Sequence, residues 1–372
     1  MNLKTAYHKY HRYVDCGGER LTRKVTSVAE VKSVIKRHDM YDKINWDTTQ
    51  QMEFDDFWKT NYGKKISNKW HRIYESINGQ YCVDYFPEML YTTKLEPLLN
   101  DYRYAEVLAD KAFVDTFAGV VHCNAPETIV LRSKGIFYDY KRRVITIDKA
   151  RTLLRNYKKD IVIKPTTDSG SGKAIRIVRA DDLKTVVRDL EHFGKDYVMQ
   201  AVINQHDIFK SLNPTSVNTL RVMTYILNDN IYHIPLACRM GSNSSNVDNI
   251  HAGGLGVGVN DNGSMHSTAY QLGYGNSDKS FVKHPVTGVT FADIMLPSIK
   301  EVIEKAYELH GRLPHLGVIS WDFTVDNNCE PVLIELNLWN QGIWFPQIVH
   351  GKGAFGDNTI GVLSLLKEKR NS

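Results

Sequence analysis

The stretch that most constrains the fold of this chain runs from residue 317 to 337 and reads GVISWDFTVDNNCEPVLIELN. Its β-branched and aromatic residues flank the turn-favouring residues 326–328 (DNN), which predicts two strands joined by a polar turn. Because side chains alternate between the two faces of a strand, Asp322 lies on the polar face of the first strand, and Glu335 and Asn337 share one face of the second. The pattern therefore predicts a hairpin that brings two carboxylates and an amide together.

These three polar side chains allow two interpretations. Opposed or diagonal positions on neighbouring strands lie about 4.5 to 8 Å apart, so Asp322, Glu335 and Asn337 can surround one Mg²⁺ ion, whose oxygen ligands lie about 2.0 to 2.1 Å away. Alternatively, they form the solvated face of an antiparallel sheet. The apolar flanks favour central strands, on which carboxylates need a partner or a metal.

Length and composition set outer bounds. A chain of 372 residues is too long for one ordinary core and predicts two or three subdomains. Its 42% hydrophobic and 24% charged residues are typical of a globular enzyme. The net charge of +5 agrees with an anionic ligand such as a nucleotide, whereas a protein that binds nucleic acid concentrates its basic residues far more. We therefore expect no nucleic-acid partner.

Cysteine usage and hydropathy indicate a compartment. The five cysteines are odd in number and form no CxxC pair, which predicts a reduced, cytoplasmic protein without structural zinc. They are Cys16, Cys82, Cys123, Cys238 and Cys329. The sequence starts without an apolar leader segment, and no run approaches the roughly 18 apolar residues of a membrane span, so we expect neither secretion nor a spanning helix.

The region from residue 1 to 104 is polar and has helical periodicity, for example from Thr48 to Asn61. Its first forty residues are rich in Lys and Arg. A basic face of this kind suits an acidic glycan, a sugar nucleotide or an anionic membrane surface, to which the protein would attach peripherally. The alternative is a solvated helical surface.

A glycine-rich loop is the second candidate for binding chemistry. An apolar strand ending in Lys164 is followed by the loop PTTDSGSGK, residues 165–173. Its glycines allow backbone N–H groups to approach phosphate oxygens. It is not a P-loop, because that motif needs Gly at Thr167, Ser or Thr at Ala174 and a following helix. We interpret it as a lid between two strands, with a simple turn as the alternative.

Three further cations stand at informative positions. Lys111 opens a helix that is predicted to begin near Asp110 and to stop near Gly119. Arg221 and Arg239 stand among apolar residues in two predicted strands. A planar guanidinium in such a place binds a phosphate or carboxylate ligand, or pairs with an acid of the protein.

The segment VDNIHAGG, residues 247–254, is a further candidate. Its paired glycines can bring backbone amides close to a substrate, with Asn249 and His251 as hydrogen-bonding side chains. A simple loop is the competing interpretation.

Together these segments resemble the ATP-grasp enzymes, and most closely the sugar-transfer-associated ATP-grasp family, which is linked to bacterial surface-polysaccharide gene clusters. The resemblance covers roughly residues 105–342 and rests on seven segments in the family's order: ADKAFVDTF, IVIKPTTDSGSGK, SVNTLRVMTY, LACRM, VDNIHAGG, HPVTG and SWDFTVD with PVLIELN. It implies an α+β class, the ATP-grasp fold, in which two α+β subdomains grip ATP between antiparallel sheets. The implied regions are 1–104, mainly helical, 105–203, the small or lid subdomain, and 204–372, the C-terminal subdomain with the Mg²⁺-binding hairpin.

The resemblance also implies a role for each candidate residue. The α- and β-phosphates of ATP would be held by Lys111 and Lys164. The triphosphate would be covered by Asp168, Ser169, Gly170, Ser171, Gly172 and Lys173. The adenine edge would be read by Gln200, Ala201 and Val202, and the ribose by Gln205 or Asp207. Mg²⁺ would be bound by Asp322, Glu335 and Asn337. The γ-phosphate, the acceptor carboxylate and the acyl phosphate would be held by the catalytic residues Arg221, Arg239, Asn249 and His251.

One position departs from the family pattern. Many relatives carry Pro three residues after the metal-binding Asn, whereas this chain has Asn340. We therefore expect unusual acceptor recognition near Asn340 and Gln341.

The implied function is that of an ATP-dependent carboxylate–amine ligase. Such an enzyme would form an acyl phosphate, release ADP and phosphate, and join an amino acid or similar small group to a sugar, sugar nucleotide or glycan in surface-polysaccharide or capsule biosynthesis. Two alternatives stay open, an ATP-dependent sugar kinase that uses the same site and a non-catalytic nucleotide-binding scaffold. The sequence assigns no oligomeric state, and acceptor recognition is expected in residues 1–104.

Overall fold

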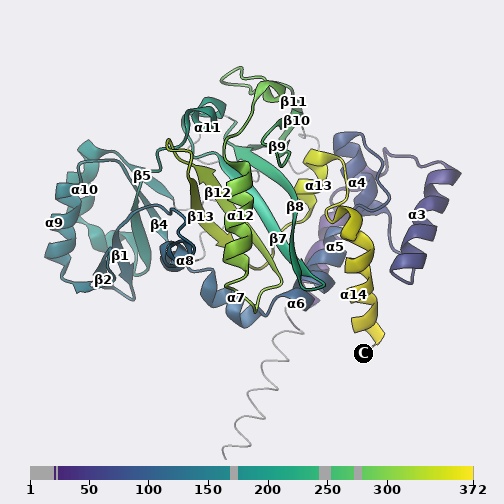
Figure 1. Ribbon diagram of the computed structural model, residues 1–372, viewed down its shortest axis with the longest axis horizontal. Helices are drawn as coiled ribbons and strands as arrows, with labels where there is room; N and C mark the ends of the chain where they lie inside the picture. The colour runs from purple at the N-terminus through teal and green to yellow at the C-terminus, as the bar shows by residue number, and fades with distance from the viewer. Residues whose placement is uncertain (1–20, 22–23, 168–174, 243–252, 272–278, 372) are drawn as a thin grey trace, which may run out of the picture. The chain divides into compact units, whose positions relative to one another are not determined.

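The computed structural model describes residues 21, 24–167, 175–242, 253–271 and 279–371 (Figure 1). The chain forms two compact units. The first joins the residues up to Leu99 with the segment from Asn340 onward, and the second comprises Asn100 to Trp339. The division into regions 1–104, 105–203 and 204–372 stays a prediction. No helix in the described part of the chain is both long and apolar enough to cross a membrane.

The described elements of the first unit are helical. They are α2 (His38–Tyr41), α3 (Thr48–Asn61), α4 (Lys69–Asn78), α5 (Glu88–Leu90), the π-helical turn η1 (Tyr91–Leu95), α6 (Glu96–Leu99), α13 (Trp344–His350), the 3-10 turn η8 (Gly356–Asn358) and α14 (Thr359–Asn371). Helix α3 begins with a capping box, because Asp47 Oδ1 accepts from the N–H of Gln50 at 2.8 Å and Gln50 Oε1 accepts from the N–H of Asp47 at 3.1 Å. The helix predicted from Thr48 to Asn61 is confirmed.

Two buried carboxylates hold the returning segment of the first unit. Glu88 Oε2 accepts from the N–H groups of residues 343 and 344, both at 3.0 Å. Glu96 accepts from the N–H groups of residues 340 and 341 at 3.1 and 3.0 Å. Burial raises the pKa of Glu96 to about 8, although these hydrogen bonds oppose the shift. Four backbone donors therefore fix residues 340–344 to the N-terminal helices.

The second unit contains two sheets. The strands of the first are β1 (Thr128–Ser133), β2 (Ile136–Asp139), β3 (Val144–Ile145), β4 (Ile161–Pro165), β5 (Arg176–Val178) and β6 (Tyr197–Ala201). Those of the second are β7 (Thr219–Leu227), β8 (Asn230–Met240), β9 (Leu255–Val259), β10 (Met265–Gln271), β11 (Lys279–Phe281), β12 (Val318–Val325) and β13 (Pro331–Asn337). The strand orders are β3-β2-β1-β6-β4-β5 and β11-β10-β9-β8-β7-β12-β13. Every pair is antiparallel, which confirms the predicted α+β class with two antiparallel sheets.

Helices cover both sheets. They are α7 (Tyr102–Leu108), α8 (Val114–Val120), α9 (Ile147–Tyr157), α10 (Leu183–Arg188), α11 (Asp207–Leu212) and α12 (Ile299–His310), with the 3-10 turns η2 (Lys111–Phe113), η4 (Ala180–Asp182), η5 (Leu190–Phe193) and η7 (Phe291–Asp293). Helix α9 packs on β1 and β2, and α12 packs on β7, β8, β12 and β13 (Figure 1). The buried residues of α12 recur at helical spacing, at Ile299, Val302, Ala306 and Leu309. The apolar cores under these helices hold the strands that carry the polar residues of the site.

Candidate functional site

The predicted hairpin is formed by β12 and β13. Asp322 pairs with Glu335, and Ser320 pairs with Asn337. All eight residues of β12 are buried, because this strand lies between β7 and β13. The predicted hairpin is confirmed. The expectation of central strands is confirmed for β12 and wrong for β13, which is the edge strand of the sheet. The alternative of a solvated polar face is wrong for Asp322, which is only 5% exposed.

Asp322 lies between two arginines. Arg221, which pairs with it on β7, donates from Nε to Oδ1 at 2.6 Å and from Nη2 to Oδ2 at 3.1 Å. Nη2 of Arg239, on β8, lies 2.8 Å from Oδ2. Burial alone would raise the pKa of Asp322, but the two guanidinium groups outweigh it and hold that pKa below its ordinary value. Both Arg221 and Arg239 thus pair with an acid of the protein, as one of the two interpretations predicted.

Glu335 faces two lysines. Its Oε1 lies 2.8 Å from Nζ of Lys111. Lys111 and Lys164 are both 7% exposed. Burial lowers the pKa of Lys164 to about 8. The negative charge of Glu335 opposes this shift, and the repulsion from Lys111 adds to it. Glu335, Lys111 and Lys164 therefore lie close together in a buried environment of low dielectric constant.

The local backbone explains how Lys111 reaches this place. Asp110 caps the turn η2, because its Oδ1 accepts from the N–H of Ala112 at 2.8 Å. The N–H of Lys111 donates to the C=O of Thr166 at 2.9 Å, which ties the turn to the end of β4, next to Lys164. The predicted helix start at Asp110 is confirmed.

The cluster carries an excess of positive charge. Its cations are Lys111, Lys164, Arg221 and Arg239, and its acids are Asp322 and Glu335, so these side chains sum to 4 − 2 = +2. Charge that is buried without a counter-charge is costly, and guanidinium and ammonium groups bind phosphate and carboxylate oxygens. The charge of the cluster therefore favours an anionic ligand.

The donor set of the hairpin also fits a hard cation. Asn337 donates from Nδ2 to Oδ2 of Asp322 at 3.3 Å. The buried hydroxyl of Ser320, opposite Asn337, has no hydrogen-bond partner among the described residues. Within the described part of the chain no three His, Cys, Asp or Glu side chains form a metal site. Two carboxylates and an amide are the incomplete oxygen set that suits Mg²⁺ when phosphates and water complete the shell.

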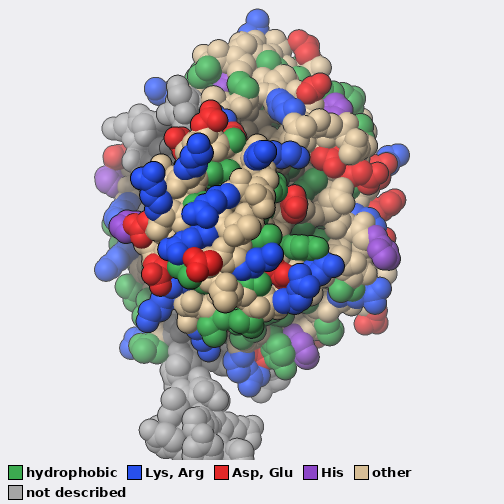
Figure 2. All heavy atoms as spheres, turned by 90° about the vertical axis from the view of Figure 1, so that its left-hand side faces the viewer, with side chains coloured by type: hydrophobic (Ala, Val, Ile, Leu, Met, Phe, Trp, Pro, Cys, Tyr) green, Lys and Arg blue, Asp and Glu red, His purple; other side chains and the backbone are tan. Residues whose placement is uncertain are grey.

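Basic side chains also gather on the outer surface of the second unit. Figure 2 shows that Lys and Arg outnumber Asp and Glu on the face that carries α9 and α10. The exposed basic residues of these elements and their flanks include Lys149, Arg155, Lys158, Lys184 and Arg188. A surface of this sign attracts anionic ligands.

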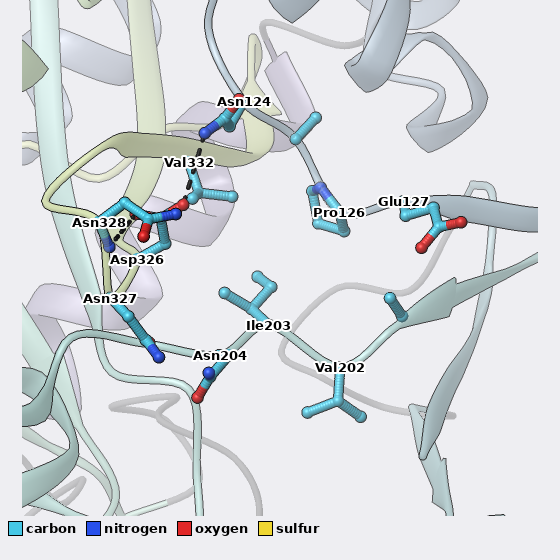
Figure 3. A pocket seen from close by; sticks show the side chains of 12 residues that line it. Asn124, Pro126, Glu127, Val202, Ile203, Asn204, Asp326, Asn327, Asn328 and Val332 are labelled. Atoms are coloured by element: carbon cyan, nitrogen blue, oxygen red, sulfur yellow. Dashed lines mark hydrogen bonds between the residues drawn. The ribbon is translucent and has the colours of Figure 1, made fainter. Parts of the chain in front are cut away.

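A cavity of about 300 Å³ lies at the end of β6 (Figure 3). Its lining comes from residues 124–127, which lead into β1, residues 201–204, which follow β6, residues 326–328 in the turn of the hairpin, and Val332. Of the predicted adenine-reading residues, Ala201 and Val202 are part of this lining. The hairpin that carries the acidic residues thus also supplies a wall of the cavity.

The other predicted nucleotide residues lie elsewhere. Gln200 is buried and donates from Nε2 to Oγ1 of Thr128 at 3.3 Å, and it does not line the cavity. Gln205 is buried in hydrogen bonds with the backbone of Asn218. The side chain of Asp207 is 97% exposed at the start of α11. The ribose role of Gln205 or Asp207 stays a prediction, and neither residue lines the cavity.

Some predicted residues lie outside the described part of the chain. These are the loop residues Asp168, Ser169, Gly170, Ser171, Gly172 and Lys173, together with Asn249 and His251. Their roles stay predictions.

Two contributors to the site were not predicted. Thr219 Oγ1 accepts from Nε and Nη2 of Arg239 at 3.1 and 2.9 Å. Its position two residues before Arg221, on the same strand face, is a signal that sequence reasoning can use. The cavity-lining residues 124–127 carry no comparable pattern, since their role depends on segments far apart in the sequence.

Comparison with solved structures finds distant neighbours. D-alanyl-alanine synthetase A from Vibrio cholerae is 13% identical, with a TM-score of 0.42 over 70% of this chain and 65% of that one. The VanG D-Ala:D-Ser ligase from Enterococcus faecalis is 13% identical, with a TM-score of 0.40 over 69% and 60%. The biotin carboxylase from Campylobacter jejuni is 13% identical, with a TM-score of 0.42 over 73% and 48%. The chain therefore spans less than two thirds of the length of each of these proteins.

No curated protein sequence matches the chain. A protein-family model does, and its match extends over residues 90–361 of the 372. That span includes the lysines, the arginines, the acidic hairpin and the cavity. The model is that of the sugar-transfer associated ATP-grasp proteins, and the chain belongs to this family.

Proposed function

We propose that the chain is an ATP-dependent carboxylate–amine ligase that activates its acceptor as an acyl phosphate. The observation that carries the proposal is the cluster of four buried or half-buried cations around Asp322 and Glu335, with its excess of two positive charges. Phosphoryl transfer is catalysed mainly by positioning and by stabilising negative charge on non-bridging oxygens. A preorganised cationic cluster supplies both without a covalent role for the protein.

The proposed reaction has two steps. A carboxylate oxygen of the acceptor attacks the γ-phosphorus of ATP, and the bond to ADP breaks. The amine nitrogen then attacks the acyl carbon and loses a proton while the bond to phosphate breaks. In this scheme Lys111 and Lys164 hold the α- and β-phosphates, and Arg221 and Arg239 hold the γ-phosphate and the acceptor carboxylate, which a planar guanidinium binds with two parallel donors.

The remaining nucleotide contacts follow from the same proposal. The cavity beside Ala201 and Val202 would take the adenine, since about 300 Å³ is at the lower end of small-ligand sites. The loop of residues 168–173 would cover the triphosphate, and Asn249 and His251 would contact the reacting groups. Asp322, Glu335 and Asn337 would hold Mg²⁺, which when bound neutralises charge on the phosphates.

The acceptor and the compartment are part of the proposal. The family's association with sugar transfer supports an acceptor that carries a sugar, either free, nucleotide-linked or in a glycan. We propose an amino acid or similar amine as the second substrate, in cytoplasmic steps of surface-polysaccharide biosynthesis. The basic surface around α9 and α10 supports an anionic acceptor.

Phosphate release by the purified protein tests the proposal. Mg-ATP is supplied with a matrix of uronic acids, their nucleotide-linked forms and amino acids, with and without hydroxylamine. We expect phosphate release that requires a carboxylate, and a hydroxamate when hydroxylamine replaces the amine. A stable phosphosugar without hydroxamate would instead establish a sugar kinase. Mg-ATP binding without turnover across the matrix would support the nucleotide-binding scaffold.

Glu335→Gln tests the assignment of the site. The change removes a charge that faces Lys111 and the proposed metal, and we expect turnover to fall by about 10²–10³-fold. Glu330→Gln is the matched control, because Glu330 is exposed in the turn of the same hairpin. Its turnover should stay within about twofold of the unaltered protein. Near-normal turnover of Glu335→Gln would reject the site.

A further inference from the structure

The turn that carries Lys111 is held by an arginine from the edge of the first sheet formed by β3 and β2. Arg142 lies between β2 and β3. Its Nη2 donates to the C=O of Ala112 at 2.6 Å and to Oδ1 and Oδ2 of Asp115 at 2.6 and 2.8 Å. Both partners follow Lys111 within four residues. One guanidinium nitrogen therefore fixes the start of α8 just beyond the lysine.

The network continues to the wall of the cavity. Oδ2 of Asp115 accepts from Oγ1 of Thr128 at 3.0 Å. That hydroxyl oxygen accepts from Nε2 of Gln200 at 3.3 Å, and the same Nε2 lies 3.4 Å from the C=O of Pro126. Pro126 lines the cavity. A continuous chain of hydrogen bonds thus joins Arg142 to the Lys111 turn on one side and to the cavity wall on the other.

The backbone at Arg142 is arranged for this contact. Its φ of 61° lies in the left-handed region, which residues other than glycine rarely adopt. Asp139 stabilises the turn by accepting from the N–H groups of residues 141 and 143 at 2.9 and 3.0 Å. A second nitrogen of Arg142, Nη1, is buried and has no partner among the described residues. Side chains held in this way by a strained backbone are concentrated at functional sites.

The neighbouring arginine shows what an ordinary surface pair looks like here. Arg143 contacts Asp139 within its own turn, with Nη2 2.6 Å from Oδ2, and its side chain is 67% exposed. The side chains of Arg142 and Asp115 are 31% and 27% exposed, and their pair joins two elements far apart in the sequence. The two adjacent arginines have the same chemistry, but Arg142 is more buried and contacts a distant element, whereas Arg143 contacts its own turn.

We propose that Arg142 is a positioning residue that sets Lys111 for binding the phosphates of the nucleotide, with Asp115 as the link between the two. This inference rests on the proposed function in one respect, that Lys111 binds phosphate. The backbone around Lys111 is held by interactions with Asp110, Thr166 and Arg142, and loss of the Arg142 contact would leave the first two. The ammonium group of Lys111 would then also occupy positions from which it cannot contact the phosphates.

The test is the affinity for Mg-ATP, measured by titration calorimetry on matched variants. We expect Arg142→Met to weaken binding about tenfold or more, which equals about 1.4 kcal/mol, and Arg143→Met to change it by less than about twofold. Arg142→Lys should restore most of the affinity, because an ammonium group can replace the donors of Nη2. Asp115→Asn is the second variant, should Arg142→Met fail to fold.

A double-mutant cycle separates positioning from a general loss of structure. If Arg142 acts through Lys111, Arg142→Met adds no further loss in a Lys111→Met background. Full additivity of the two losses would overturn the inference, as would normal affinity of Arg142→Met. Absence of Mg-ATP binding by the unaltered protein would overturn the proposed function itself, a result distinguishable from the other two.

Discussion

Asp322 is the residue on which the charge of the site depends. Its carboxylate lies within 2.6 to 3.1 Å of nitrogens from Arg221 and Arg239. Without it, two guanidinium groups with exposed fractions of only 17% and 15% would lose the carboxylate that both of them contact. Asp322 therefore holds both arginines in place.

Asp322→Asn should be strongly destabilising in the absence of nucleotide. Removing one partner of a buried ion pair costs about 3–5 kcal/mol. Asp148→Asn is the control, because Asp148 pairs with Arg151 on the surface of α9 with 83% of its side chain exposed, and we expect a change of less than about 1 kcal/mol. Urea unfolding of both variants gives the comparison. A loss below about 1 kcal/mol for Asp322→Asn would contradict this role.

At the scale of residues, the sequence was informative where side-chain alternation decides the outcome. The convergence of Asp322, Glu335 and Asn337 followed from strand periodicity alone. The contacts of Arg142 did not, because they depend on a left-handed turn residue that no local pattern signals. The tertiary hydrogen bonds of Gln205 are equally invisible in the sequence.

At the scale of elements, one asparagine fastens the hairpin of β12 and β13. Nδ2 of Asn100 donates to the C=O of Val318 at 2.7 Å and to the C=O of Leu338 at 2.8 Å. Its Oδ1 accepts from the N–H of Val318 at 2.9 Å. Asn100 thus joins the start of β12 to the residue after β13, and it is 4% exposed.

Asn100→Ala should destabilise the second unit. The change leaves buried backbone groups at Val318 and Leu338 without a partner, and each costs about 1–3 kcal/mol. Asn230→Ala is the control, since Asn230 also donates to a backbone C=O, that of Asn228, but is exposed at the start of β8. Thermal unfolding of the two variants should differ clearly. Equal melting temperatures would show that Asn100 does not fasten the hairpin.

The elements themselves were largely predictable, and their pairing was not. Periodicity identified α3, and apolar runs identified β4, β7 and β8, because these signals are local. The strand order brings β1 beside β6 and β7 beside β12, pairs that are distant in the sequence. No local pattern predicts this strand order.

At the scale of the whole molecule, the family assignment explains the two sheets and the order of the segments along this chain. It does not explain why residues 340–372 belong to the first unit. That grouping depends on Glu88 and Glu96, which accept hydrogen bonds from residues more than 240 positions later in the sequence. Composition and periodicity contain no information about such contacts.

The central claim is that a carboxylate of the acceptor attacks ATP directly. The measurement that tests it most directly uses an acceptor with ¹⁸O in its carboxylate, chosen from the matrix above, and mass analysis of the phosphate released with Mg-ATP and the amine. Because the attacking oxygen stays on phosphorus when the amide forms, the account predicts phosphate that carries ¹⁸O, with ADP as the other product. Released phosphate without ¹⁸O, or AMP in stoichiometric amount, would contradict it.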